Sequence, residues 1–470
     1  MSQSGQPEAL RQRLRRAKTD EIRGWKRPSS GPTAVADAAE STRKPSRSAS
    51  LDLKGELQAR LLDEIADQGL MWATDEEIQA AVEGFIGPVL EEEGLAFNET
   101  ERGDLVRDLV EETLGVGPLA PLMADPAVTD ILVNAPDSVY TERFGRLELS
   151  NVCFRDQAHL LRVIERIAAR VGRRIDAASP MADLRLPDGS RVNATIPPAT
   201  PDGATLSIRR FGRRRLRARE LESNGAFSEA MGGFLSEAVR YRQNVLISGG
   251  TGAGKSTLLG AMAEFIPGTE RVVTIEDTLE LILDQQNWVR LEARPANVEG
   301  QGRISARDLV INSLRMRPDR VIVGEVRGGE ALDMLQAMNT GHDGSLSTVH
   351  ANAPRDALSR VETMVLMAGV DLPSRAAREQ IVSALDLIVH VERMEDGVRR
   401  VSQIAEIVGM EGETPLLQEI FRFQRRGVHQ GQVQGDFVAT GIVPRCAESL
   451  RQRGATMPPD WFQTRPGVNS

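Results

Sequence analysis

Cysteine is scarce in this 470-residue chain, and long apolar runs are absent. The two cysteines, Cys153 and Cys446, lie far apart in the sequence, which excludes a disulfide framework and a four-thiolate zinc site. No stretch approaches the roughly 18 uninterrupted apolar residues of a membrane span, and the arginine-rich start lacks the apolar region of a signal peptide. We therefore expect a protein of the reducing cytoplasm.

Charge is abundant but segregated along a chain long enough for roughly three domains. The formal net charge is −9, yet residues 1–50 contain eleven Lys/Arg against five Asp/Glu, a net of +6. Residues 51–115 reverse the sign, with four basic and eighteen acidic side chains and a net of −14. A basic tail beside an acidic segment could bind an anionic membrane or nucleic acid, but we favour a solvated tail beside solvated helix faces.

The first 114 residues divide into a leader and a helical segment. Residues 28–50 have almost no large apolar side chain, so we interpret residues 1–50 as a disordered basic leader. Residues 51–114 carry apolar residues at helical spacing and two pairs in which a capping residue stands three positions before an acid. The stripes are Leu57, Leu61 and Ile65, then Ile78, Val82, Phe85 and Val89; the pairs are Thr74 with Glu77 and Asn98 with Glu101. A small bundle of three amphipathic helices is predicted.

Residues 115–219 change to strand-like patterns interrupted by one helix. The extended runs are residues 130–133, 139–141, 184–186, 191–196 and 206–208, and the helix occupies about residues 158–173. The Asp188-Gly189 dipeptide supplies the positive φ that a tight hairpin needs. We predict an α+β domain.

An arginine-rich stretch, residues 209–219, ends this domain. Proteins that bind single-stranded nucleic acid interleave such residues with aromatic rings, whereas Phe211 is the only ring here. We therefore favour a linker whose first arginines face another charged group, and we expect no nucleic-acid partner.

From about residue 220, strand-like apolar runs alternate with helical ones. The runs are residues 245–247, 271–275, 321–323 and 344–349. This rhythm is typical of a parallel α/β sheet. We assign residues 220–420 to this domain and interpret residues 421–470, which are rich in Gly, Arg and Gln, as a short appendage.

The strongest motif is Gly249-Gly250-Thr251-Gly252-Ala253-Gly254-Lys255-Ser256, which matches G-x-x-x-x-G-K-[ST] directly after a strand-like run. The glycines let backbone N–H groups wrap phosphates, and the following helix presents its positive end. We expect Lys255 to reach the terminal phosphates and Ser256 to ligate Mg²⁺. With Thr257 next to it, the motif predicts a site for ATP and Mg²⁺.

Hydrolysis also needs carboxylates at the metal and at the attacking water. Two strand-like runs end in acids, the first in Glu276, Asp277 and Glu280 and the second in Glu325. Because ligands of parallel sheets sit at the carboxyl ends of strands, both sets should face the phosphate loop. We expect Glu276 and Asp277 to contact the nucleotide, Glu280 to organise or deprotonate the attacking water, and Glu325 to act at Mg²⁺. Exchanged roles for Glu280 and Glu325 stay open.

Two of the five histidines, His342 and His350, bracket one strand-like run. A lone histidine on a strand is usually a satisfied core or surface residue, but this pair suggests a sensor that contacts nucleotide or couples it to a subunit interface. No cysteine joins the pair and its spacing does not suit a helical metal pair, which argues against zinc. We include His350 among the expected catalytic residues.

In this order the motifs resemble the secretion ATPases of type II and type IV secretion and type IV pili. The resemblance is closest to the Tad/Flp pilus-assembly ATPases of the CpaF type and extends over about residues 51–420. Its boxes are the Walker A box at 249–256, the Asp box at 274–277, the Walker B run at 321–325 and the His box at 338–352. The Tad type rests on softer similarity at 337–343 and 437–442. Many type II relatives carry a four-cysteine metal module that two cysteines cannot supply.

The resemblance implies a RecA-like P-loop domain, preceded by a small helical bundle and an α+β, PAS-like N-terminal domain. It implies a homohexameric ring motor, peripheral at the inner membrane, that acts on a platform protein to power pilus assembly or secretion. Arg191 and Arg209 match the arginines that the N-terminal domain lends to bound nucleotide in this family. They would stabilise phosphoryl transfer and couple it to domain closure.

Three alternative functions would account for part of the same sequence pattern. A type IV secretion ATPase that moves protein or nucleoprotein substrates has the same boxes, so this alternative stays open. A nucleic-acid translocase would use the basic tail and the arginine-rich stretch. A GTP switch would require an Asn-Lys-x-Asp motif, which the sequence lacks.

Overall fold

The computed structural model describes residues 57, 60, 61, 74–92, 98–143, 145–210, 216–294 and 301–464. The expected disordered leader, residues 1–50, lies outside the described residues, and so does part of the arginine-rich stretch at 211–215. In the described ranges, no helix combines the length and the apolar character needed to cross a membrane.

Two helices of the expected bundle are described, α3 (Asp75–Glu92) and α4 (Glu99–Thr113). Both predicted capping pairs are confirmed. The backbone N–H of Thr74 donates to Glu77 at 2.7 Å, and Asn98 and Glu101 exchange hydrogen bonds in a capping box. These contacts satisfy N–H groups that the first turn of a helix leaves unpaired.

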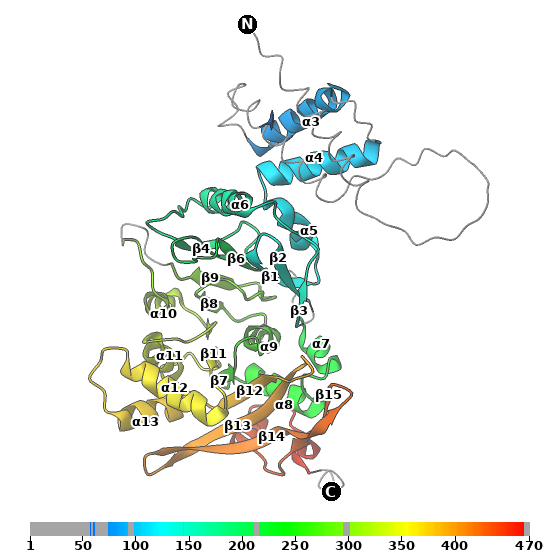
Figure 1. The fold of residues 1–470 in the computed structure, drawn as a ribbon. Helices are drawn as coiled ribbons and strands as arrows, with labels where there is room; N and C mark the ends of the chain where they lie inside the picture. The colour runs from blue at the N-terminus through cyan, green and yellow to red at the C-terminus, as the bar shows by residue number, and fades with distance from the viewer. Residues whose placement is uncertain are drawn as a thin grey trace, which may run out of the picture. The chain divides into compact units, whose positions relative to one another are not determined.

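A six-stranded antiparallel sheet follows, in the order β3-β2-β1-β6-β5-β4 (Figure 1). Its elements are η2 (Gly117–Leu119), α5 (Ala120–Ala124), β1 (Val128–Ala135), β2 (Ser138–Arg143), β3 (Arg146–Leu149), α6 (Gln157–Arg170), β4 (Met181–Arg185), β5 (Arg191–Thr195) and β6 (Thr205–Arg209). Helix α6 packs five aliphatic side chains into the core of this sheet. Gly189 has φ +90° in the turn between β4 and β5, so the predicted hairpin is confirmed.

The second sheet has nine strands in the order β15-β14-β13-β12-β7-β11-β10-β8-β9. The six strands from β12 to β9 are parallel, as the alternating pattern predicted, and the other three continue the sheet antiparallel. The strands are β7 (Val245–Gly249), β8 (Val272–Glu276), β9 (Trp288–Glu292), β10 (Arg320–Val323), β11 (Leu346–His350), β12 (Leu387–Arg393), β13 (Arg399–Glu411), β14 (Thr414–His429) and β15 (Gln432–Ala439).

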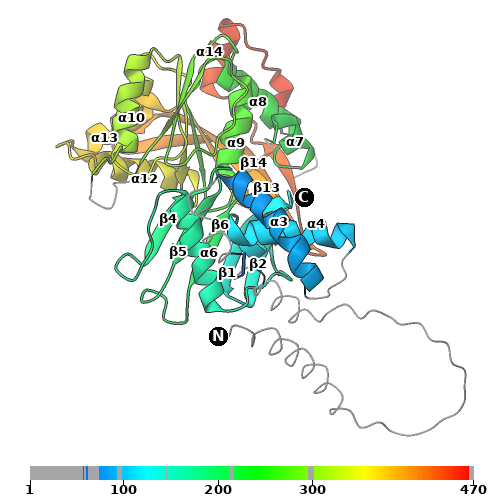
Figure 2. The same cartoon turned by 90° about the horizontal axis from the view of Figure 1, so that it is seen from above.

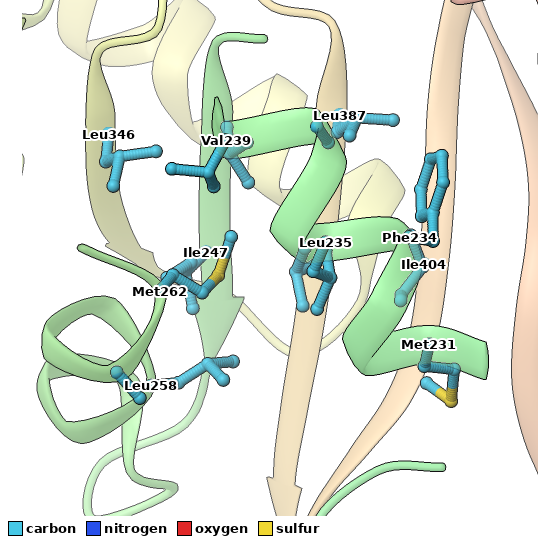
Figure 3. Close-up of a cluster of buried hydrophobic side chains, with 14 of the residues drawn as sticks. Met231, Phe234, Leu235, Val239, Ile247, Leu258, Met262, Leu346, Leu387 and Ile404 are labelled. Atoms are coloured by element: carbon cyan, nitrogen blue, oxygen red, sulfur yellow. The ribbon is translucent and has the colours of Figure 1, made fainter. Parts of the chain in front are cut away.

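Helices cover both faces of this sheet, so its central strands are buried on both sides (Figure 2). The helices are α7 (Ala218–Ser223), α8 (Glu229–Arg240), α9 (Lys255–Met262), η3 (Ala263–Phe265), α10 (Ala306–Ser313), η4 (Leu314–Met316), α11 (Glu330–Asn339), α12 (Pro354–Leu366), α13 (Ser374–Ala384), α14 (Arg445–Gln452) and η5 (Pro459–Phe462). Ile247 of β7 packs with α8 and α9, as Figure 3 shows, whereas Leu246 packs on the other face with α10 to α13. This burial holds β7 rigidly where the phosphate loop begins.

The chain after residue 420 is part of this domain, which corrects its interpretation as a short appendage. Strand β14 runs through position 421 without a break, and β15, α14 and η5 follow. Phe421 and Phe462 are buried against Phe234 of α8, with all three ring centroids 5.8 Å apart. The charged, half-exposed residues of the outer strands concealed this contribution, because their pattern resembles that of a polar tail.

A buried arginine joins the ends of several strands and helices on the side of the sheet opposite the phosphate loop. The side chain of Arg320 is fully buried, and its Nε donates to Glu270 at 2.5 Å. Its Nη1 donates to the carbonyl oxygens of Val239 and Gly344 at 2.7 and 3.0 Å. Gly344 has φ +82°, and a Cβ there would lie 2.1 Å from Nη1. The guanidinium therefore occupies a site that a larger residue at 344 would close.

We predict that Arg320→Met lowers the free energy of unfolding by about 3–5 kcal/mol, because it removes the buried guanidinium that donates to Oε2 of Glu270 and to two carbonyl oxygens. Arg375→Met is the matched control. It breaks an exposed pair with Glu379 on α13 and should cost less than about 1 kcal/mol. Urea denaturation followed by circular dichroism measures both, and equal losses would contradict a structural role for Arg320.

Candidate nucleotide-binding site

The phosphate loop connects the buried strand β7 to helix α9 through two residues in the left-handed region. Gly252 has φ +69° and Gly254 has φ +96°, conformations that glycine adopts at little cost. Helix α9 begins at Lys255, so the backbone N–H groups of its first turn point toward the loop. The local fold is therefore the strand–turn–helix that the motif requires.

A cavity of about 810 Å³ opens beside this loop. Residues of both the α+β domain and the ATPase domain line it. The phosphate-loop side contributes Thr251, Gly252, Gly254, Lys255, Ser256 and Thr257; the following strands contribute Glu280, Glu325, Arg327, His350, Arg393 and Arg399; the α+β domain contributes Asp130, Glu142, Arg191, Arg209 and Arg210. Of the expected nucleotide contacts, Gly249, Gly250 and Ala253 support the loop but do not line this cavity.

Three expected catalytic residues form a connected chain at the carboxyl edge of the sheet. Nζ of Lys255 donates to the carbonyl oxygen of Gly250 at 2.9 Å and lies 3.2 Å from Nδ1 of His350. Nε2 of His350 lies 2.8 Å from Oε1 of Glu325, the separation of an ion pair. Burial and the neighbouring ammonium lower the pKa of His350, so the ring is neutral at pH 7.

The identity of Lys255 is itself informative, because it is the only lysine after Lys54 in a chain that otherwise uses arginine. An ammonium is a compact charge with three donors, which suits a narrow loop, whereas a guanidinium is a broad planar fork. Burial lowers the pKa of Lys255, while the nearby Glu325 carboxylate opposes that shift. An anionic ligand bound at the loop would therefore stabilise the charged form of Lys255.

Arg327 is a site residue that the sequence argument did not single out. Its guanidinium donates to Glu325 at 2.7 Å and lies 3.2 Å from Asp277. The hydrogen bond to Glu325 raises the pKa of Arg327. Arg327 thus joins the acids at the ends of β8 and β10, and its place two residues after Glu325 was the available signal.

The acids that follow β8 have different environments. Glu276 is buried outside the cavity, and its Oε2 accepts from the backbone N–H groups of Glu280 and Leu281 at 2.7 and 2.9 Å. Burial raises the pKa of both Glu276 and Asp277. Glu276 therefore fixes the conformation of the loop that carries Glu280. Asp277 does not line the cavity. A nucleotide contact by Glu276 or Asp277 stays a prediction.

The two arginines expected from the α+β domain lie side by side in the cavity wall. Arg191 of β5 is paired in register with Arg209 of β6. Nη1 of Arg191 lies 3.7 Å from Oε1 of Glu280, and Nε of Arg209 lies 3.3 Å from Asp130. Both arginines therefore reach the same cavity as Lys255 within one chain. His342, by contrast, lies outside the cavity near the carbonyl oxygen of Ala337.

Two further arginines, Arg393 and Arg399, line the cavity from the hairpin between β12 and β13 and were not predicted. They are paired in register across the hairpin. The Asp396-Gly397 dipeptide between them is a turn signal from which this pairing could have been inferred. The arginines that line the cavity therefore come from both domains.

The residues present fit a nucleoside triphosphate with Mg²⁺. A Cβ at Gly249 would lie 2.3 Å from the carbonyl oxygen of Val391, and one at Gly254 would lie 2.9 Å from Cδ of Arg399. The close-packed loop therefore depends on glycine at both positions. Lys255 and the arginines supply positive charge, and Ser256 and Glu325 are oxygen donors of the kind that Mg²⁺ prefers. A cavity of this size is typical of small-molecule sites.

Comparison with known proteins identifies the family of the chain. The family described as "Type II/IV secretion system protein" matches residues 112–435. A "putative conjugal transfer protein" of Mycobacterium tuberculosis is 40% identical over 322 residues, which cover 67% of this chain and 91% of that protein. The conjugal transfer protein TrbB of Rhizobium radiobacter is 34% identical over 309 residues, which cover 65% of this chain and 91% of that protein.

Among solved structures, the VirB11 ATPase of the Brucella suis type IV secretion system, crystallised with sulphate, is 30% identical. The match covers 61% of this chain and 94% of that chain, with a TM-score of 0.34. The family match runs through the α+β domain, the phosphate loop and the strands that carry Glu280, Glu325 and His350. The chain therefore belongs to the type II/IV secretion system protein family.

Proposed function

We propose that the protein is a motor ATPase of the type IV secretion kind, which uses ATP hydrolysis to move protein or nucleoprotein substrates across the inner membrane. The protein is an ATPase, in keeping with its family. The observation that carries the proposal is the contact chain from Lys255 through His350 to Glu325, set in a cavity that both domains line. Two relatives are named for conjugal transfer, and a third is a type IV secretion ATPase.

The phosphate loop and the arginines would bind and orient the nucleotide. Backbone N–H groups of the loop and of the first turn of α9 favour phosphate oxygens, and Lys255 adds charge. Ser256 and Glu325 would hold Mg²⁺, which neutralises phosphate charge and orients the phosphates for in-line attack. His350 keeps Lys255 and Glu325 at fixed separations, because its neutral ring contacts both.

In the proposed mechanism Glu280 acts on the attacking water. Its backbone N–H is fixed by the buried Glu276 carboxylate, while its own carboxylate lines the cavity opposite Arg191. A carboxylate so placed can orient an attacking water and accept its proton. Arg191 and Arg209 would stabilise charge on the transferred phosphoryl group, which links turnover to the position of the α+β domain.

A homohexameric ring at the inner membrane is the assembly we propose for this motor. The proposal rests on the resemblance of the four boxes to ring-forming secretion ATPases. In it the protein associates peripherally from the cytoplasmic side and acts on a platform protein. Closure of the α+β domain over the phosphate loop would be the movement that the partner receives.

Tad/Flp pilus assembly is the second candidate. Similarity at residues 337–343 and 437–442 favours it, although those residues form the end of α11 with its following turn and the end of β15, outside the cavity. The names of the compared relatives favour type IV transfer. Both candidate functions use the same ATP hydrolysis, so they differ in the partner or substrate that the motor moves.

A chromosomal Lys255→Ala allele in the native host tests which load is driven. We expect transfer of a marked plasmid or reporter protein to recipient cells to fall by orders of magnitude, because the motor lacks its phosphate-binding cation. Complementation with the wild-type gene is the control. Unchanged transfer accompanied by loss of surface pilus fibres would favour the pilus candidate instead.

In purified protein, we predict that Lys255→Ala lowers ATP turnover by at least about 100-fold, the scale of losing one charged group at a reaction centre. Lys255 belongs to none of the apolar clusters, so the thermal unfolding midpoint should stay close to that of wild type. Phosphate release measures turnover, and Arg375→Ala, outside the cavity on α13, is the control. Turnover at the wild-type rate would contradict the phosphate-loop assignment.

Glu280→Gln and Glu325→Gln should separate the two carboxylate roles. Both should slow hydrolysis by about 10²–10⁴-fold, because each removes a charge needed in the reaction. Glu280→Gln should keep the dependence of nucleotide affinity on Mg²⁺, whereas Glu325→Gln should weaken it. Titration of ADP binding with and without Mg²⁺ measures the difference. The reverse pattern would exchange the roles of the two acids, and normal turnover in both variants would place the reaction elsewhere.

A further inference from the structure

The hairpin between β12 and β13 places two like charges opposite each other. Arg393 and Arg399 are cross-strand partners, and the turn between them is closed by hydrogen bonds between Met394 and Val398 and between Gly397 and Met394. Like charges directly opposite in an antiparallel pair destabilise it. The fold tolerates an unfavourable pair here, which indicates that another interaction offsets it.

The pair faces the phosphate loop because of the strand order. Strand β12 runs parallel to β7, with His390 in register with Ser248, so the hairpin begins beside the first glycine of the loop. Nε of Arg399 donates to the carbonyl oxygen of Gly252 at 3.0 Å. Arg393 lies on the same side, 3.8 Å from the position that a Cβ of Gly252 would occupy. Both guanidinium groups thus border the turn that is expected to wrap phosphates.

Two carboxylates, Glu142 and Asp130, act on Arg399 only from beyond ion-pair distance. Within the described ranges Arg399 forms no ion pair, and the nearest acid partner of Arg393 is Glu142 at 3.7 Å. Partial burial and the neighbouring Arg393 lower the pKa of Arg399, and the carboxylates of Glu142 and Asp130 oppose this shift only in part, although the Arg399 side chain is open to the cavity. An anion bound beside Arg393 and Arg399 would therefore stabilise this part of the cavity wall.

We propose that Arg399, supported by Arg393, is a phosphate-binding residue of the nucleotide site supplied by the ATPase domain itself. The inference rests on the proposed function and adds a contact to it. Arg191 and Arg209 come from the α+β domain and depend on its position, whereas Arg399 is fixed to β7 by the sheet. Arg399 therefore acts in every position of the α+β domain, and it retains nucleotide when the domains separate.

A purely structural role for Arg399 predicts something different. If the side chain served only to hold the Gly252 carbonyl oxygen, any neutral donor of similar length would replace it. If its charge contacts phosphates, a neutral donor would fail and another cation would succeed in part. Gln and Lys at position 399 distinguish these roles.

The test measures dissociation constants of ADP with Mg²⁺ by isothermal titration calorimetry for wild type, Arg399→Gln, Arg399→Lys and Lys255→Ala. Arg422→Ala is the control, since this exposed arginine of β14 pairs with Glu419 outside the cavity. We expect Arg399→Gln to weaken ADP binding by about 10- to 100-fold, the scale of a lost charge-assisted hydrogen bond. Arg399→Lys should recover part of that loss, and Arg422→Ala should bind as wild type does.

Each other outcome has a definite meaning. Wild-type affinity in Arg399→Gln overturns the inference and leaves only the hydrogen bond to Gly252. Equal losses in the Gln and Lys variants also overturn it, since charge would then not matter. Absence of nucleotide binding in the wild type would refute the proposed function, whereas binding that Lys255→Ala abolishes and Arg399→Gln preserves would refute this inference alone.

Discussion

The parallel pairing of β7 with β11 on one side and β12 on the other decides which side chains meet at the phosphate loop. His350 is in register with Gly249 through β11, and His390 is in register with Ser248 through β12. Parallel strands end at the same edge, so one neighbour brings His350 and the other brings the arginine hairpin. Burial of β7 on both faces prevents a shift of register, because a slip by one residue would move its apolar side chains to the wrong helices.

The concentration of positive charge is the second constraint on the site, and the surrounding carboxylates partly neutralise it. Lys255, Arg191, Arg209, Arg327, Arg393 and Arg399 all border one cavity. Without partners they would repel one another, and in this structure Glu325, Glu280, Asp130 and Glu142 lie near them. In the proposed mechanism Glu325 would contact the metal and Glu280 the attacking water, while Asp130 and Glu142 belong to the α+β domain. Binding of a polyphosphate would therefore exchange partners among these groups, and exchange of partners is a direct route from ligand binding to movement.

The motifs made the location of the site predictable, because each one follows a strand of a parallel sheet. Lys255, Glu280, Glu325 and His350 were named from local sequence, and the structure brings all four to one cavity. Glu276 could not be distinguished from Glu280 in this way, since burial, not residue type, turns it toward the loop backbone. Arg399 was missed for another reason. Its neighbours in the cavity lie about 150 residues earlier in the chain, and only the pairing of β12 with β7 brings them together.

The same dependence on tertiary contacts explains the error at the C-terminus. Phe421 and Phe462 become core residues only through α8, and the strand pattern of residues 414–439 carries charge on its exposed face. A single amphipathic strand at the edge of a large sheet is hard to predict from its own residues, because its stability depends on packing against the neighbouring strands. In contrast, the hairpin at Gly189 and both helix caps depend on neighbours within four residues and were predicted correctly.

The interface between the α+β domain and the ATPase domain consists largely of charged contacts, and this composition suits a motor. In the described ranges each apolar cluster belongs to one domain, and none joins the two. In the described residues, ion pairs between the domains include Arg185 with Glu292, Arg191 with Glu280, and Arg393 with Glu142, and Arg393 also donates to the carbonyl oxygen of Gly145. Half-exposed pairs of this kind contribute about 1 kcal/mol or less each. In the proposed mechanism the domains would therefore separate at small cost, and an anion that attracts arginines from both domains would favour their closure.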